Sequence, residues 1–72
     1  MNKIVINDFL DEIAVRDKTY TFEKLQYIVD EVNKMTGLNI SSYKLFCNYL
    51  QENGNEEILA YKLNRKIKEM IK

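Results

Sequence analysis

Apolar residues recur every three or four positions along most of the chain, which is the spacing of an amphipathic helix. The clearest stripe consists of Leu25, Ile28, Val29, Val32 and Met35. Thr21 is a favourable N-cap before this stripe, and Gly37 suits a left-handed C-cap after it. The spacing therefore predicts a helix over residues 22–36.

The N-terminal segment also carries a helical stripe, formed by Phe9, Leu10, Ile13 and Ala14. Asn7 or Asp8 can cap this first helix, and the polar run after Arg16 should end it. The β-branched segment 2–6 is then either an extended lead-in or part of the same helix. The local pattern leaves these two alternatives open.

Two further helices are predicted after residue 40. Ser41 or Ser42 caps the third helix, and Gly54 closes it in the left-handed conformation. Asn55 caps the fourth helix, which has acidic residues near its positive end and lysines near its negative end. The third stripe is Leu45, Phe46, Tyr49 and Leu50, and the fourth is Ile58, Leu59, Leu63, Ile67, Met70 and Ile71.

The chain has no proline and only two glycines, so little interrupts helix formation. Its 72 residues suffice for one small domain, and we expect a single all-α bundle of four or five short helices over residues 1–72. Tyr20 and Tyr49 are predicted to be buried. The other predicted core residues are Leu10, Ile13, Leu25, Ile28, Val32, Leu45, Phe46, Leu50, Leu59 and Leu63.

Composition argues against enzymatic chemistry. The chain has no histidine, which removes the commonest general base and metal ligand. Cys47 is the lone cysteine, so no intrachain disulfide or thiolate cluster can form, and no glycine-rich phosphate loop is present. The free thiol suits the cytoplasm, and no apolar run is long enough to span a membrane. We therefore expect no catalytic residue, metal, cofactor or small-molecule substrate.

The formal charge is zero, yet it is unevenly distributed along the chain. Residues 1–31 carry four basic and seven acidic side chains, whereas residues 32–72 carry seven basic and four acidic ones. Zero net charge argues against a polycation that coats nucleic acid, because non-specific affinity comes from neutralised phosphates. DNA binding would therefore need a local basic face. The excess of Lys, Ile and Asn over Arg suggests an AT-rich bacterial or phage genome.

Residues 29–50 place an apolar helix, a glycine-led turn and a serine-rich helix start in succession. This order resembles the helix-turn-helix of transcription regulators of the phage Cro/repressor type. Asn33 stands where that family prefers alanine, and Ile40 occupies a turn position that is usually polar. The resemblance implies a helix-turn-helix over residues 22–53, with a somewhat longer turn. The matching positions are Gly37, Leu38, Ser41 and Ser42, with Val32, Tyr43 and Phe46 as apolar anchors.

The resemblance implies a small bacterial or phage regulator that binds DNA, with the helix after the turn in the major groove. The residues that this helix would present to phosphates and base edges are Ser41, Ser42, Tyr43, Lys44 and Asn48. Because that helix carries one cation, a single copy would bind weakly, and we expect a homodimer or a partner. The hypothesis implies DNA affinity that weakens with salt.

A protein-interaction module is the alternative. Tyr27, Tyr43 and Tyr61 fit the apolar stripes poorly, so we expect them to be partly exposed. Exposed tyrosines are enriched at protein interfaces. Such a module would keep the helix-turn-helix shape but bind a protein, as an antirepressor-type modulator of a repressor or as an inhibitor of a host defence protein. Its acidic N-terminal half could meet a basic DNA-binding face. The sequence alone leaves both partners open.

Overall fold

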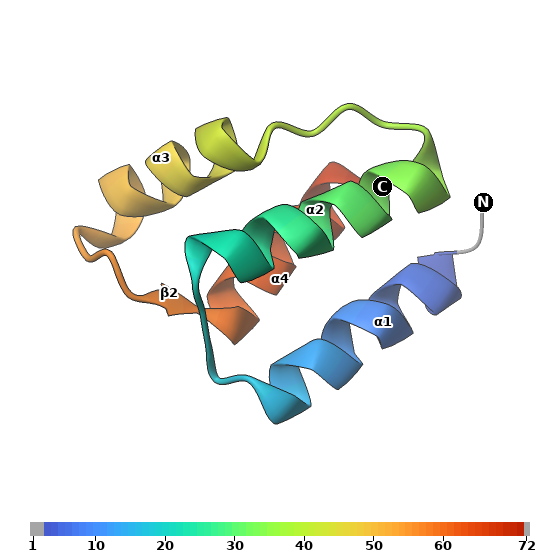
Figure 1. The fold of residues 1–72 in the computed structure, drawn as a ribbon, viewed down its shortest axis with the longest axis horizontal. Helices are drawn as coiled ribbons and strands as arrows, with labels where there is room; N and C mark the ends of the chain where they lie inside the picture. Colours follow the sequence, from blue (N-terminus) through green and yellow to red (C-terminus); the bar gives the residue numbers. More distant parts are fainter. Residues whose placement is uncertain (1–2, 72) are drawn as a thin grey trace.

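Four helices and one short pair of strands make up the computed structural model, which describes residues 3–71 (Figure 1). In chain order they are α1 (Lys3–Arg16), β1 (Thr19–Tyr20), α2 (Phe22–Thr36), α3 (Ser42–Asn53), β2 (Ile58–Leu59) and α4 (Ala60–Met70). The prediction of an all-α fold is therefore confirmed. None of these helices combines the length and the apolar character that a membrane crossing requires.

The ends of α2 and α3 lie where the capping residues predict. The Thr21 hydroxyl accepts a hydrogen bond from a backbone N–H in the first turn of α2 at 3.1 Å, and the Ser41 hydroxyl does the same for α3 at 3.2 Å. Gly37 and Gly54 close the two helices with φ of 74° and 62°, in the left-handed region that glycine tolerates best. Each cap acts within about one helical turn, so local sequence sets these boundaries.

Helix α1 begins earlier than its capping residues predict. Asn7 and Asp8 lie inside the helix, so the described residues before them are helical and do not form an extended lead-in. Residue 2, the first of that predicted lead-in, lies outside the described residues. Burial of one continuous face outweighs the weak helix preference of β-branched residues. The buried residues on this face are Ile6, Leu10 and Ile13.

The start of α4 also differs from the prediction. Asn55 does not cap a helix, because its side-chain oxygen accepts a hydrogen bond from the Glu57 backbone N–H at 2.8 Å and forms a turn. The next two residues form β2, which pairs with β1 in antiparallel register. The chain enters α4 only at Ala60. The strand depends on a partner far earlier in the chain, so no local pattern indicates it.

The strand pair closes a loop of chain that contains α2 and α3 (Figure 1). Tyr49 of α3 reinforces this closure, because its hydroxyl accepts a hydrogen bond from the Leu59 N–H at 2.9 Å and donates one to the Glu57 carbonyl at 3.0 Å. Helix α1 packs against α4 and α2 and lies on the opposite side of the molecule from α3 (Figure 1). Helix α3 is therefore a peripheral element that is fixed at both ends.

One continuous core forms between the helices, and Tyr20 and Tyr49 belong to it as predicted. Phe46, Leu50 and Leu59 are only partly buried, which corrects the prediction that they are core residues. Helix α3 lies at the edge of the fold, so neighbouring positions on it reach the flank, where the Phe46 ring lies 5.4 Å from the Phe22 ring. The remaining core residues are Ile6, Leu10, Ile13, Leu25, Ile28, Val29, Val32, Leu45, Ile58, Ala60, Leu63, Ile67 and Ile71.

Asn64 of α4 is the only polar residue among residues 3–71 that is fully buried. Its side-chain nitrogen donates a hydrogen bond to the Leu10 carbonyl at 2.8 Å, and its side-chain oxygen accepts one from the Tyr20 hydroxyl at 3.2 Å. Burial raises the pKa of the Tyr20 hydroxyl above its usual value, so this hydroxyl stays protonated and keeps its role as donor. The amide thus joins α4 to α1 and β1.

Asn64→Ala should lower the free energy of unfolding by about 1–3 kcal/mol, because it leaves the buried Tyr20 hydroxyl without its partner and removes the hydrogen bond to the Leu10 carbonyl. Urea unfolding followed by circular dichroism measures the change. Asn48→Ala is the matched control, since Asn48 is exposed on α3 and its truncation should change stability by less than about 0.5 kcal/mol. Equal effects of the two substitutions would show that the buried amide does not hold these elements together.

Candidate binding surface at the start of α3

A groove lies between the start of α3, the loop before it and the end of α4. Its volume of about 420 Å³ falls within the usual range of binding pockets, roughly 300–1,000 Å³. It joins segments that are far apart in the sequence. The lining residues are Leu38, Asn39, Ile40 and Ser41 of the loop, Lys44, Leu45 and Asn48 of α3, and Met70 of α4.

Three of the five residues predicted to contact DNA line this groove. Ser41, Lys44 and Asn48 are exposed along it, and Ser41 also caps α3. Tyr43 is 69% exposed but lies outside the groove, and Ser42 is half-buried. The structure therefore brings Ser41, Lys44 and Asn48 together on one side of α3, leaves Tyr43 exposed outside the groove and partly covers Ser42.

The groove is apolar along its floor and on two sides. Leu45 is only 1% exposed, whereas Leu38 and Met70 remain 40% and 46% exposed. Ile40 is partly buried and packs against the core. The apolar side chains thus continue from the interior of the molecule to its surface, where nothing within residues 3–71 covers them further.

Side chains of α2 hold the loop between α2 and α3. The Asn33 amide donates a hydrogen bond to the Ile40 carbonyl at 3.0 Å and accepts one from the Ile40 N–H at 2.9 Å. The Thr36 hydroxyl accepts a hydrogen bond from the Leu38 N–H at 3.1 Å and donates one to the Val32 carbonyl at 2.7 Å. The asparagine that departs from the Cro/repressor pattern is therefore the residue that shapes this loop.

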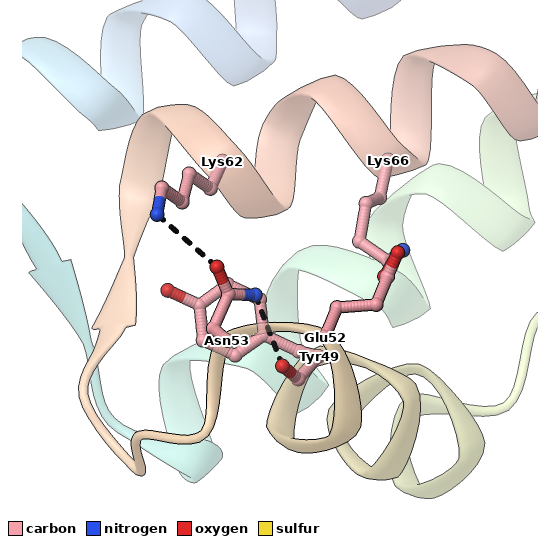
Figure 2. Close-up of polar contacts among 5 residues, drawn as sticks. All are labelled: Tyr49, Glu52, Asn53, Lys62 and Lys66. Carbon is pink, nitrogen blue, oxygen red and sulfur yellow. Dashed lines mark hydrogen bonds and ion pairs between the residues drawn. The ribbon is translucent and has the colours of Figure 1, made fainter.

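Most basic side chains of α4 are engaged within the molecule. Lys62 donates a hydrogen bond to the Asn53 side-chain oxygen at 3.1 Å, and Lys66 pairs with Glu52. Figure 2 shows both contacts, which link α4 to the C-terminal half of α3. Lys68 pairs with Asp11 of α1 at 2.7 Å. Two of these lysines therefore have a carboxylate partner, so part of the positive charge that follows the third helix in the sequence is neutralised.

Lys44 at the edge of the groove differs from these lysines. Among residues 3–71, no carboxylate lies within ion-pair distance of its ammonium group. The first turn of α3 contains no acidic residue, whereas α2 carries Glu23 in its first turn. The positive end of the α3 dipole is therefore not offset by a side chain of its own. The groove is electropositive at its α3 edge.

The three tyrosines predicted at a protein interface are all exposed. Tyr27, Tyr43 and Tyr61 are 51%, 69% and 58% exposed, and they lie on α2, α3 and α4. The Lys24 ammonium lies 5.7 Å from the centre of the Tyr27 ring, which is cation–π distance. None of the three lines the groove, and they come from three different helices.

Sequence reasoning missed the apolar residues of the groove. Leu38 and Met70 each stand at the end of a segment, so helical periodicity cannot show that they face the same space. The polar Asn33 inside an otherwise apolar face was the one local signal, because a buried or half-buried amide needs partners. Within residues 3–71, no cluster of acidic or cysteine side chains has the arrangement of a metal site.

Comparison of the chain with protein-family models, with curated proteins and with solved structures finds no match. The function must therefore be argued from the groove and from the side chains that surround it. Those side chains supply apolar area, one free cation and a few polar groups, which are the components of a binding surface.

Asn33→Ala should loosen the loop, because the part-buried N–H and carbonyl groups of Ile40 lose their partners. We expect the free energy of unfolding to fall by about 1–3 kcal/mol and the Ile40 amide hydrogen to exchange faster. Asn39→Ala is the control in the same loop, since the Asn39 side chain makes no hydrogen bond within residues 3–71. NMR hydrogen exchange measures the effect, and an unchanged rate at Ile40 would contradict this role of Asn33.

Proposed function

We propose that this chain is a protein-interaction module that binds a partner protein through the groove at the start of α3. One observation carries the proposal, which is that Leu38 and Met70 stay exposed around a groove with an apolar floor. Exposed apolar patches with polar rims mark interaction sites. The module acts by binding and not by catalysis, and we place it in the cytoplasm, where Cys47 would stay reduced.

The distribution of cations supports a protein partner over DNA. Affinity for DNA grows with the number of phosphates that lysines and arginines neutralise. Lys44 is the only cation on α3, and Lys66 and Lys68 of α4 already face carboxylates. A protein partner needs no such surplus of charge. An antirepressor-type modulator or an inhibitor of a host protein fits a small chain that offers one apolar binding surface.

A photo-crosslinking phenylalanine analogue in place of Asn48 should capture a partner protein in cells of the organism that encodes the chain. Asn48 is exposed along the groove, so the replacement leaves the core intact. Electrophoresis and mass spectrometry should identify one main crosslinked protein. The same analogue in place of Tyr27, which is exposed on α2 outside the groove, is the control. Equal capture from both positions, or capture of nucleic acid from position 48, would contradict the proposal.

DNA binding by α3 is the second candidate, and one observation favours it. Lys44 and Asn48 are exposed on the same side of α3, Lys44 in its first turn and Asn48 at its middle. In a helix-turn-helix, the N-terminal half of the second helix enters the major groove. Lys44 can pair with phosphate or guanine, and Asn48 can form two hydrogen bonds with adenine. A homodimer would double these contacts.

Fluorescence anisotropy with genomic DNA fragments at low salt tests this second candidate. If α3 binds DNA, Lys44→Ala should weaken binding and reduce the slope of log affinity against log salt concentration by about one. Lys18→Ala removes an exposed cation between α1 and β1 and should leave both quantities unchanged. No binding of the unmodified chain to any fragment at low salt would exclude DNA as the partner.

A further inference from the structure

We propose that the groove at the start of α3 binds a short acidic segment of the partner protein. A large apolar side chain of that segment would fill the groove, and a neighbouring carboxylate would pair with Lys44. The inference rests on the proposed protein-interaction function, and it names the chemistry of the segment that the groove recognises. Three properties of the groove lead to it, namely its apolar surface, its charge and its fixed shape.

The apolar surface suits a large apolar side chain. Leu45 forms a buried floor, and Leu38 and Met70 stand exposed at the sides. Covering them removes apolar area from water, which is the main driving force of most protein association. A groove of about 420 Å³ has room for a side chain of the size of leucine or phenylalanine. The partner therefore has to supply such a side chain.

The charge of the groove selects an acidic neighbour for that side chain. Lys44 is the only charged residue that lines the groove, and no carboxylate within residues 3–71 pairs with it. The first turn of α3 has no acidic residue, so the positive end of the helix dipole adds to the potential of this lysine. Complementary potentials then favour a carboxylate and disfavour a basic segment.

The shape of the groove favours a segment of a protein over an enclosed small molecule. Most of its lining side chains are exposed, so the groove is open along its length. Asn33 and Thr36 already hold the loop, so binding does not have to order it. The hydroxyl of Ser41 and the amide of Asn48 lie along the groove, where they can bond to the backbone of a bound segment.

Selection of short random peptides from a displayed library, with the full chain as bait, tests the proposal. We expect the enriched peptides to share a large apolar residue within a few positions of Asp or Glu. Lys44→Glu should weaken binding of the best synthetic peptide by about tenfold or more, because it places like charges side by side. Lys18→Glu makes the same change of charge outside the groove and should alter the affinity by less than about twofold.

A second pair of variants tests the apolar half of the site. Leu38→Ser removes one side of the groove and should weaken peptide binding severalfold, whereas Val15→Ser removes an exposed apolar side chain of α1 that lies outside the groove and should not. Both positions lie on the surface, so both variants should keep the circular dichroism spectrum and thermal stability of the parent chain. Equal peptide affinity of the two variants would contradict a role for Leu38.

Several results would overturn the acidic segment as the occupant. The first is enrichment of peptides that are basic or lack acidic residues. The second is equal enrichment of the same peptides in a parallel selection on the Lys44→Glu chain. The third is a stable dimer of the chain that Leu38→Ser dissociates. In the last case a second copy would fill the groove. Photo-crosslinking at position 48 distinguishes failure of the acidic-segment proposal from failure of the proposed protein-interaction function. Capture of a protein together with non-acidic peptides rejects only the proposed partner chemistry.

Discussion

The buried amide of Asn64 aligns three elements that no local interaction brings together. It needs both an acceptor and a donor in the interior, and it finds them in the Leu10 carbonyl of α1 and the Tyr20 hydroxyl of β1. A shift of α1 along α4 would leave buried polar groups without partners, at about 1–3 kcal/mol for each. Apolar contacts alone are less selective, so this amide sets the register between α1, β1 and α4.

The alignment of α1, β1 and α4 also fixes the two ends of the segment that contains α2 and α3. Tyr20 lies just before α2, and the pairing of β1 with β2 returns the chain to the same place after α3. The Tyr49 hydroxyl then binds the backbone around β2, so the end of α3 is fixed as well. Asn33 and Thr36 hold the connecting loop through hydrogen bonds, and Ile40 of that loop packs against the core. The groove therefore has a defined form in the free chain.

Ion pairs within the molecule determine which lysines remain free to contact a partner. Lys66 pairs with Glu52 of α3 and Lys68 pairs with Asp11 of α1, so the charges of these two lysines already have carboxylate partners. Lys44 keeps its charge beside the groove, with no carboxylate partner in the part of the chain that the structure describes. Lys44 is thus an unpaired cation beside an apolar groove in a chain of zero net charge. This combination suits selective contact with a protein segment better than non-specific attraction to DNA.

The helices α2 and α3, their ends and the outward face of α3 could be read from the sequence. Caps such as Thr21 and Gly37 act within about one turn, and apolar periodicity is a property of neighbouring residues. The strand pair, the late start of α4 and the groove could not be read in this way. They depend on residues that are distant in the chain, such as Leu38 and Met70, and on which carboxylate reaches which lysine. Packing of the helices alone brings those residues together, so only the tertiary structure decided where this protein has an open apolar groove.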